Sequence, residues 1–209
     1  MPGSIASGIS KPPPPPVGGD SGGNYGPRGA ARRASKTGLL VLLAATTMLF
    51  AAFSSAFVVR RGLSDDWVAL ALPRILFLNT GILLASSLML EIARRQLRRG
   101  ARSSFNLYWT AGTALGILFL VGQALAWREL KAAGIFLATN PSSSFFYLLT
   151  AVHAVHLLGG ITALSYVNVQ ALRLRLGPGK RTAVDISSWF WHFLDGLWVY
   201  LMFLFYVWG

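Results

Sequence analysis

The sequence has no cysteine and little charge, and both shortages exclude whole classes of protein. Without cysteine the chain has no disulfide framework, no iron–sulfur cluster and no thiolate site for copper or zinc. Only 12% of the 209 residues are charged, which is about half the fraction of roughly 25% that soluble domains carry. The low charge therefore argues against a surface that faces water on all sides.

Acidic residues are scarcer still, with 7 Asp and Glu against 19 Lys and Arg and a net charge of +12. Such a balance could attract nucleic acid, but 54% of the residues are hydrophobic and the mean hydropathy is +0.52. A nucleic-acid-binding domain is not this apolar, so we expect no nucleic-acid partner. The positive charge instead suits loops that face anionic lipid headgroups.

Residues 1–36 differ in composition from the rest of the chain. They contain the run Pro12 to Pro16, many glycines and serines, and a basic cluster that ends at Lys36. A segment of this kind buries too little apolar surface to offset the entropy lost on ordering. We therefore expect 1–36 to be a disordered, basic tail.

Five apolar runs follow, and each is long enough to cross a bilayer, because about 20 helical residues span a hydrocarbon core of roughly 30 Å. The longest uncharged stretch, 132–172, is divided at Asn140 and Pro141, a good N-cap followed by a good first helical residue. Gly177-Pro178-Gly179 then interrupts the chain. The sequence predicts an all-α membrane protein with a domain over 37–209, a bundle of five transmembrane helices. Their expected bounds are about 37–60, 73–93, 104–127, 141–172 and 186–208.

The distribution of Lys and Arg predicts the orientation of these helices. The tail and the loops near Arg94 to Arg102 and Arg173 to Arg181 hold 14 basic residues, whereas the other two loops hold 5. Positive charge concentrates on the cytoplasmic side, so the N-terminus should be cytoplasmic and the C-terminus outside. Arg74 and Glu91, near the ends of the second run, are placed to reach the membrane interface.

Asp195 is the most informative polar residue, because an aspartate deep in a membrane helix costs about 2.5 to 3.5 kcal/mol on the insertion scale. His192 lies three residues before it on the same face, and Asp185 and Trp189 continue this stripe. The stripe is consistent with a proton relay or an ion site. One carboxylate and one imidazole do not make a pathway, which favours an internal polar anchor in which Asp195 pairs with a donor.

The other two histidines, His153 and His156, are three residues apart on the fourth predicted helix. Either one could join His192 in bis-histidine haem ligation, whereas copper or zinc would need three such ligands. Helix–helix hydrogen bonding also explains the two histidines, and we favour this interpretation over a bound metal or haem. Gly112 and Gly116 form a GxxxG pair that predicts close helix packing.

Three motifs resemble elements of subunit III of haem-copper terminal oxidases. The run Trp191 to Trp198 matches that family's Trp-His-Phe-x-Asp-x-x-Trp signature, and Asp185 falls where the family has a glutamate. The run Thr150 to Gly160 is similar to its Thr-Gly-x-His-Gly-x-His-x-x-x-Gly element. A third run, Leu78 to Ser87, is similar to its Asn-Thr…Ser-Ser helix. The resemblance extends from about Met48 through all five runs.

The resemblance implies a non-redox accessory subunit of an aerobic oxidase, a cytochrome c oxidase in a bacterial inner membrane, in the short five-helix form. Haems and copper would belong to partner subunits I and II, and this chain would hold no cofactor except bound phospholipid. The subunit would support proton delivery, stability during turnover and lipid binding. A fourth small subunit or a larger respiratory supercomplex are further partners that this family allows.

Two positions depart from the family pattern. Thr46 stands where the family commonly has the glutamate of a Ser-Glu-x-Met element, and Ala151 replaces the glycine of the histidine motif. A proton-related role tied to that missing carboxylate is therefore not expected in this chain.

We expect no catalytic and no metal-ligating residue in this chain. Five polar residues are expected to lie inside the bundle and to lock the fourth and fifth helices together: His153, His156, Asp185, His192 and Asp195. Six others are candidates for contact with lipid or with the membrane interface: Asn79, Gln123, Trp127, Trp189, Trp191 and Trp198.

Two alternative functions remain compatible with the sequence. One is a subunit III-like partner of a quinol oxidase or a nitric oxide reductase, because this subunit does not identify the electron donor. The other is a small transporter, which would call for an inverted repeat, broken helices or paired carboxylates along a path. The sequence shows no two-fold internal similarity, and only Asp195 lies deep in a span, so the transporter is disfavoured.

Overall fold

The computed structural model describes residues 27–63, 67, 73–173 and 181–208, and the regular structure in these ranges is entirely α-helical. Five helices have the length and apolar composition needed to cross a membrane, with candidate spans of 25 to 32 residues. The predicted all-α fold with five spans is confirmed. The helices are α1 (Pro27–Leu63), α2 (Arg74–Arg98), α3 (Arg102–Ala132), α4 (Pro141–Leu172) and α5 (Arg181–Trp208).

Four helices are longer than the sequence predicted. α1 begins at Pro27, so 27–36 is helical and the tail boundary expected at residue 36 is wrong, while 1–26 lie outside the described residues. The expected bounds followed hydropathy, which ends where charge begins. Arg, Lys and Ala are good helix formers, so α2, α3 and α5 also extend through charged residues beyond the apolar runs. The predicted break at 177–179 falls outside the described residues.

The start of α4 is the boundary that the sequence predicted correctly. The Asn140 Oδ1 accepts a hydrogen bond from the Ser143 backbone N–H at 2.9 Å, and the Ser143 Oγ accepts one from the Asn140 N–H at 3.3 Å. This reciprocal capping box satisfies two backbone donors that the first helical turn leaves free. Pro141 occupies the first turn, where it has no N–H to satisfy.

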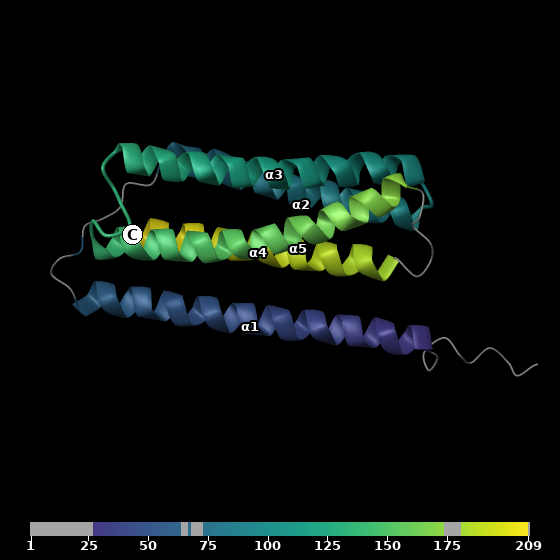
Figure 1. The fold of residues 1–209 in the computed structure, drawn as a ribbon, viewed down its shortest axis with the longest axis horizontal. Coiled ribbons are helices and arrows are strands. Elements are labelled where there is room, and N and C mark those ends of the chain that lie inside the picture. The colour runs from purple at the N-terminus through teal and green to yellow at the C-terminus, as the bar shows by residue number, and fades with distance from the viewer. Residues whose placement is uncertain (1–26, 64–66, 68–72, 174–180, 209) are drawn as a thin grey trace, which may run out of the picture.

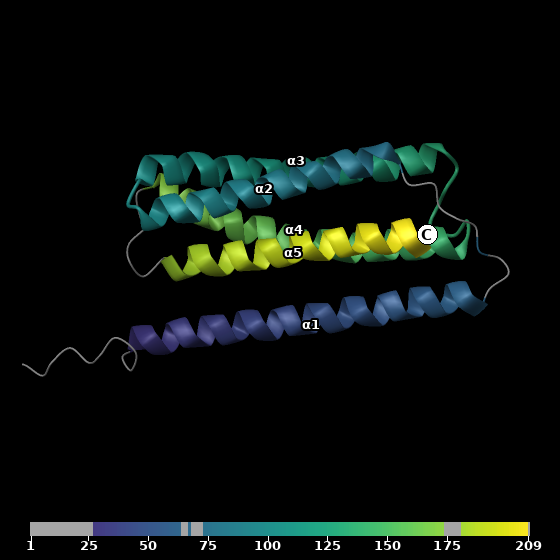
Figure 2. The same ribbon diagram turned by 180° about the vertical axis from the view of Figure 1, so that it is seen from behind.

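The helices lie side by side in three layers, with α2 and α3 in one, α4 and α5 in the next, and α1 on the outside (Figure 1). The reverse view shows the same order, with α1 on the far side of α4 and α5 from α2 and α3 (Figure 2). α1 packs on α4 and α5 through rings: Phe57 lies edge-on to Phe145 and Phe205, at centroid distances of 5.6 and 6.0 Å. Neighbouring helices in sequence run in opposite directions, as in an up-and-down bundle.

Glycines allow the closest approaches between helices. The Gly112 carbonyl accepts a hydrogen bond from the Ser86 Oγ at 2.7 Å, which joins α3 to α2. A Cβ added at Gly116 would lie 2.7 Å from the Trp191 ring, and one added at Gly160 would lie 3.1 Å from it. The fully buried Trp191 indole of α5 is therefore enclosed by glycines of α3 and α4. The GxxxG pair packs closely, as predicted.

We predict that Gly116→Ala destabilises the protein by about 1 to 3 kcal/mol, because the new methyl group overlaps a rigid, buried indole. Gly159→Ala is the matched control, since nothing lies within 4 Å of a Cβ added there. It should be neutral or slightly stabilising, because alanine is the better helix former. Thermal unfolding of the detergent-solubilised protein measures both, and equal effects of the two substitutions would contradict the prediction.

Candidate functional site

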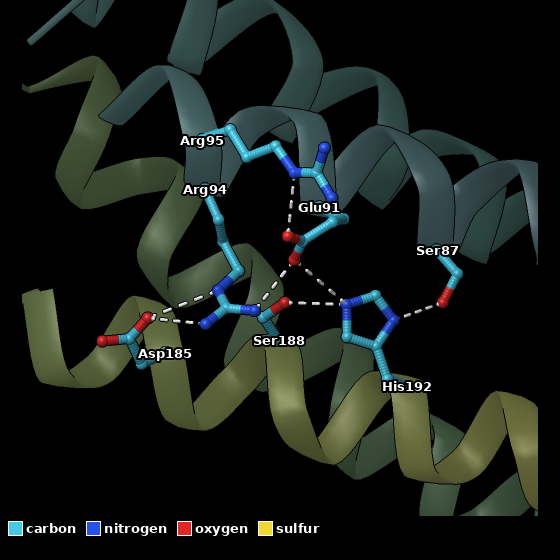
Figure 3. Close-up of polar contacts among 7 residues, drawn as sticks. All are labelled: Ser87, Glu91, Arg94, Arg95, Asp185, Ser188 and His192. Atoms are coloured by element: carbon cyan, nitrogen blue, oxygen red, sulfur yellow. Dashed lines mark hydrogen bonds and ion pairs between the residues drawn. The ribbon is translucent and has the colours of Figure 1, made fainter. Parts of the chain in front are cut away.

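A network of charged and polar side chains connects the C-terminal half of α2 to the N-terminal half of α5 (Figure 3). Arg94 lies at its centre, with only 11% of its side chain exposed. Its Nη1 donates to the Glu91 Oε2 at 2.9 Å, one turn earlier on α2. Its Nε and Nη2 both donate to the Asp185 Oδ1 on α5, at 3.3 and 3.1 Å. One guanidinium group thus bridges two carboxylates on different helices.

Glu91 extends the network to a second arginine and to His192. Its Oε1 accepts a hydrogen bond from the Arg95 Nε at 3.1 Å, and its Oε2 lies 4.0 Å from the His192 Nε2. The imidazole also contacts two hydroxyl groups: its Nδ1 shares a hydrogen bond of 2.6 Å with Ser87, and its Nε2 one of 3.2 Å with Ser188. Both ring nitrogens are therefore occupied by neighbouring side chains of this chain (Figure 3).

Asp195 lies one turn beyond His192, with 7% of the residue exposed. The Ser87 side chain, which already bonds His192, also interacts with the Asp195 carboxyl group. The Oδ1 of Asp195 nevertheless has no hydrogen-bond partner within the described part of the chain. Ser87 is thus the side chain placed to act as the donor expected for Asp195, and the Oδ1 remains without a partner among the described residues.

The structure corrects the predicted partner helix of these residues. We expected Asp185, His192 and Asp195 to lock the fourth and fifth helices together. Their inter-helix partners lie on α2 instead, namely Arg94 for Asp185 and Ser87 for both His192 and Asp195. Helical spacing shows that residues share a face, but it does not show which of several neighbouring helices that face meets.

His153 and His156 lie apart from this network and contact their neighbours through ring faces and edges. The His153 ring stacks on Trp198 of α5 at a centroid distance of 5.2 Å, and Phe50 of α1 lies edge-on at 6.3 Å. The His156 Nδ1 contacts the Val152 carbonyl of its own helix at 2.8 Å. Among the described residues, no three His, Asp or Glu side chains form a group that could hold a metal ion.

Four of the six lipid or interface candidates are buried, which corrects that prediction. Asn79 donates from Nδ2 to the Phe119 carbonyl at 3.0 Å, and Trp198 donates from Nε1 to the Thr80 Oγ1 at 3.0 Å. Gln123 is 2% exposed and Trp191 is completely buried. The sequence gives a residue's depth along a helix, whereas the neighbouring helices decide whether its side chain meets lipid.

The remaining two candidates are accessible to different degrees. Trp189 is 54% exposed on the surface of α5. Trp127 is half-buried, and its Nε1 donates to the Thr150 Oγ1 at 3.2 Å. Thr46, which replaces the family carboxylate, is 2% exposed and donates its hydroxyl to the Leu42 carbonyl of the same helix at 2.9 Å. Its hydroxyl therefore has a partner within α1.

The sequence analysis missed Arg94 and Glu91 as members of the site. Glu91 was interpreted as a charge near the end of a span, placed to reach the membrane interface, and Arg94 as one of the basic residues of a cytoplasmic loop. One available signal was the spacing of Glu91 three and four residues before Arg94 and Arg95, which favours ion pairs on one helix face. Another was Asp185, a carboxylate that the sequence places at the same end of the bundle as Arg94. Its own helix offers one nearby cation, Arg181.

Comparison with known proteins gives a consistent result. The family model described as cytochrome c oxidase subunit III matches residues 27–209. Over 122 residues the chain is 30% identical to the probable cytochrome c oxidase subunit 3 of Mycobacterium bovis, which covers 58% of this chain and 60% of that protein. It is 30% identical over 120 residues to cytochrome c oxidase subunit 3 of Corynebacterium diphtheriae, covering 57% of this chain and 58% of that protein. The chain thus spans about three fifths of the length of these two relatives.

A longer similarity is to cytochrome c oxidase subunit 3 of Thermostichus vulcanus, which is 31% identical over 171 residues. That alignment covers 76% of this chain and 80% of the relative.

We predict that Arg94→Met lowers the free energy of unfolding by about 1 to 3 kcal/mol, because it leaves Glu91 and Asp185 without their shared cation. The partial exposure of both carboxylates keeps this figure below that for a fully buried pair. Arg95→Met is the control: Arg95 is 68% exposed and its loss should cost no more than about 0.5 kcal/mol. Denaturant unfolding in detergent measures both, and equal losses would argue against the bridging role of Arg94.

Proposed function

The chain belongs to the cytochrome c oxidase subunit III family, and from this premise we propose that it is a non-redox accessory subunit of a bacterial cytochrome c oxidase. It is a multi-pass membrane protein with five spans. In the proposal it sits in the bacterial inner membrane beside subunits I and II, which hold the haems and copper, while this chain holds none. Electron transfer and oxygen reduction take place in those partners.

The proposal rests on one observation: the polar groups between α2 and α5 are bonded to one another. Arg94 donates hydrogen bonds to two carboxylates, and both ring nitrogens of His192 are hydrogen-bonded to serine hydroxyl groups. Ligands or catalytic groups need lone pairs or protons that are free to meet a substrate. Groups already bonded to each other across two helices suit a scaffold, because their pairing fixes the position of one helix against the other.

Two finer roles form part of the proposal. Glu91 lies 4.0 Å from the His192 Nε2, and Asp195 lies one turn beyond His192 on α5, so three groups that can take up and release a proton follow one another into the bundle, which supports a role in proton delivery to the partner subunits. A cavity of about 390 Å³ lies between α1 and α5. Its lining is mostly apolar and suits a phospholipid acyl chain. The lining residues are Thr47, Phe50, Ala51, His192, Phe193, Gly196, Leu197 and Tyr200.

Purification of the tagged chain from its own membranes tests the proposal. We expect subunits I and II to co-purify, with a haem Soret band in the complex and no such band in the chain purified alone. A partner that lacks a dinuclear copper motif would favour the quinol oxidase or nitric oxide reductase alternative. Absence of any haem-copper partner, or a stoichiometric Soret band from the isolated chain, would overturn the proposal, and solute flux by the chain in liposomes would favour a transporter.

The proposed orientation, with the N-terminus in the cytoplasm, rests on the 14 to 5 distribution of basic residues. Because the chain has no cysteine, a single introduced thiol reports one position without background from the chain. We predict that Ala138→Cys, between α3 and α4, reacts with a membrane-impermeant maleimide on intact spheroplasts. Ser103→Cys, at the start of α3, should react only after the membrane is opened. The reverse pattern would show the opposite orientation.

A further inference from the structure

Among the buried side chains that the structure describes, Gln123 and His153 each have two polar atoms and a hydrogen-bond partner for neither. Gln123 of α3 is 2% exposed and His153 of α4 is 1% exposed. The amide oxygen and nitrogen of Gln123 and both ring nitrogens of His153 are unpartnered among the described residues. A polar group buried in a membrane protein is costly when it has no partner, because neither lipid nor apolar side chains can replace its lost hydrogen bonds to water.

The packing of α3 against α4 places these two side chains at the same level. Trp109 of α3 donates to the Leu164 carbonyl of α4 at 3.1 Å, and Trp127 donates to the Thr150 Oγ1 at 3.2 Å. The two contacts show that α3 and α4 run antiparallel, because the residue numbers of the paired positions rise along α3 and fall along α4. One turn back from Trp127 is Gln123, and one turn on from Thr150 is His153. The register therefore sets the two unpartnered groups at the same level of the bundle. Phe119, one turn before Gln123, contacts the Trp198 ring at a centroid distance of 5.0 Å, and His153 stacks on the same ring.

The aromatic neighbours of His153 determine where its partner must lie. Trp198 covers one face of the imidazole at 5.2 Å, with an interplanar angle of 28°. Phe50 presents its edge at a centroid distance of 6.3 Å. The hydrogen-bonding directions of an imidazole lie in the plane of its ring, so stacking leaves them open. One nitrogen of a neutral imidazole donates and the other accepts, so the two need partners of opposite kind.

We propose that ordered water binds between Gln123 and His153 in the interior of the bundle. A direct bond between the two side chains would satisfy one ring nitrogen and one amide atom, and would leave the other two unpartnered. Water both donates and accepts, so it can meet a ring nitrogen and an amide atom whichever tautomer is present. The four unpartnered atoms carry no carboxylate charge, so the site suits a neutral ligand rather than a cation.

A third unpartnered group lies beside the same stretch of α3. The Asn79 Oδ1 on α2 has no partner among the described residues, and a Cβ added at Gly122 would collide with it. Gly122 immediately precedes Gln123, so the amide groups of α2 and α3 approach the same turn. Asn79 thus offers one more acceptor to water at this level, and buried waters commonly make about three hydrogen bonds.

Electron cryomicroscopy of the intact complex, at a resolution that shows ordered water, tests the proposal directly. We expect solvent density within hydrogen-bonding distance of the Gln123 amide and a ring nitrogen of His153. The density should be absent from the Gln123→Leu variant. An interior without such density, or a direct Gln123–His153 bond with no solvent around it, would overturn the proposal. The wild-type map alone decides this point if the variant does not assemble.

A double-mutant cycle gives an independent test on the same complex. Gln123→Met and His153→Phe should each lower the melting temperature, because each leaves the shared water with a missing partner. The melting temperature of the double variant should fall by less than the sum of the two single-variant shifts, because the double variant leaves no unpaired polar group behind. Thr162→Val is the control partner for Gln123→Met, since Thr162 is exposed and donates its hydroxyl to the Leu158 carbonyl of its own helix. Strict additivity in both cycles would contradict the inference, whatever oxidase the subunit serves.

Discussion

The arrangement of α2 and α5 depends on one guanidinium group placed between two carboxylates. Arg94 is nearly buried at the end of a membrane span, where an unpaired charge is costly. Glu91 compensates that charge from its own helix, and Asp185 compensates it from α5. Because the second partner lies on another helix, the charge balance is complete only in one register of α2 against α5. His192 and its two serines continue the same contact deeper into the bundle (Figure 3).

The sequence was sufficient for those parts of the fold that depend on depth in the membrane. Long apolar runs gave the five spans, and Asn140 with Pro141 gave the start of α4 to the residue. Hydropathy did not give the helix ends, because a helix continues into water wherever its residues are good helix formers. α1 shows this most clearly, since its first ten residues, 27–36, have the composition of the predicted tail.

The candidate site was only partly predictable, for a different reason. Motif and spacing identified Asp185, His192 and Asp195 as polar residues of one helix, but their partners on α2 follow from the packing of the bundle. Gln123 illustrates the same limit, since it was assigned to the lipid interface and is buried. A sequence gives the height of a side chain in the membrane, whereas its direction around the helix axis has meaning only once the neighbouring helices are in place.

The enclosed Trp191 has a consequence for how such chains diverge. Its indole fills the space that the missing side chains of Gly116 and Gly160 leave on two other helices. A homologue with a smaller residue in place of the tryptophan can keep the same helix spacing only by adding bulk at one of the two glycines. The three positions, far apart in the chain, are therefore coupled through the volume that they share, so a change at one of them should favour a compensating change at another.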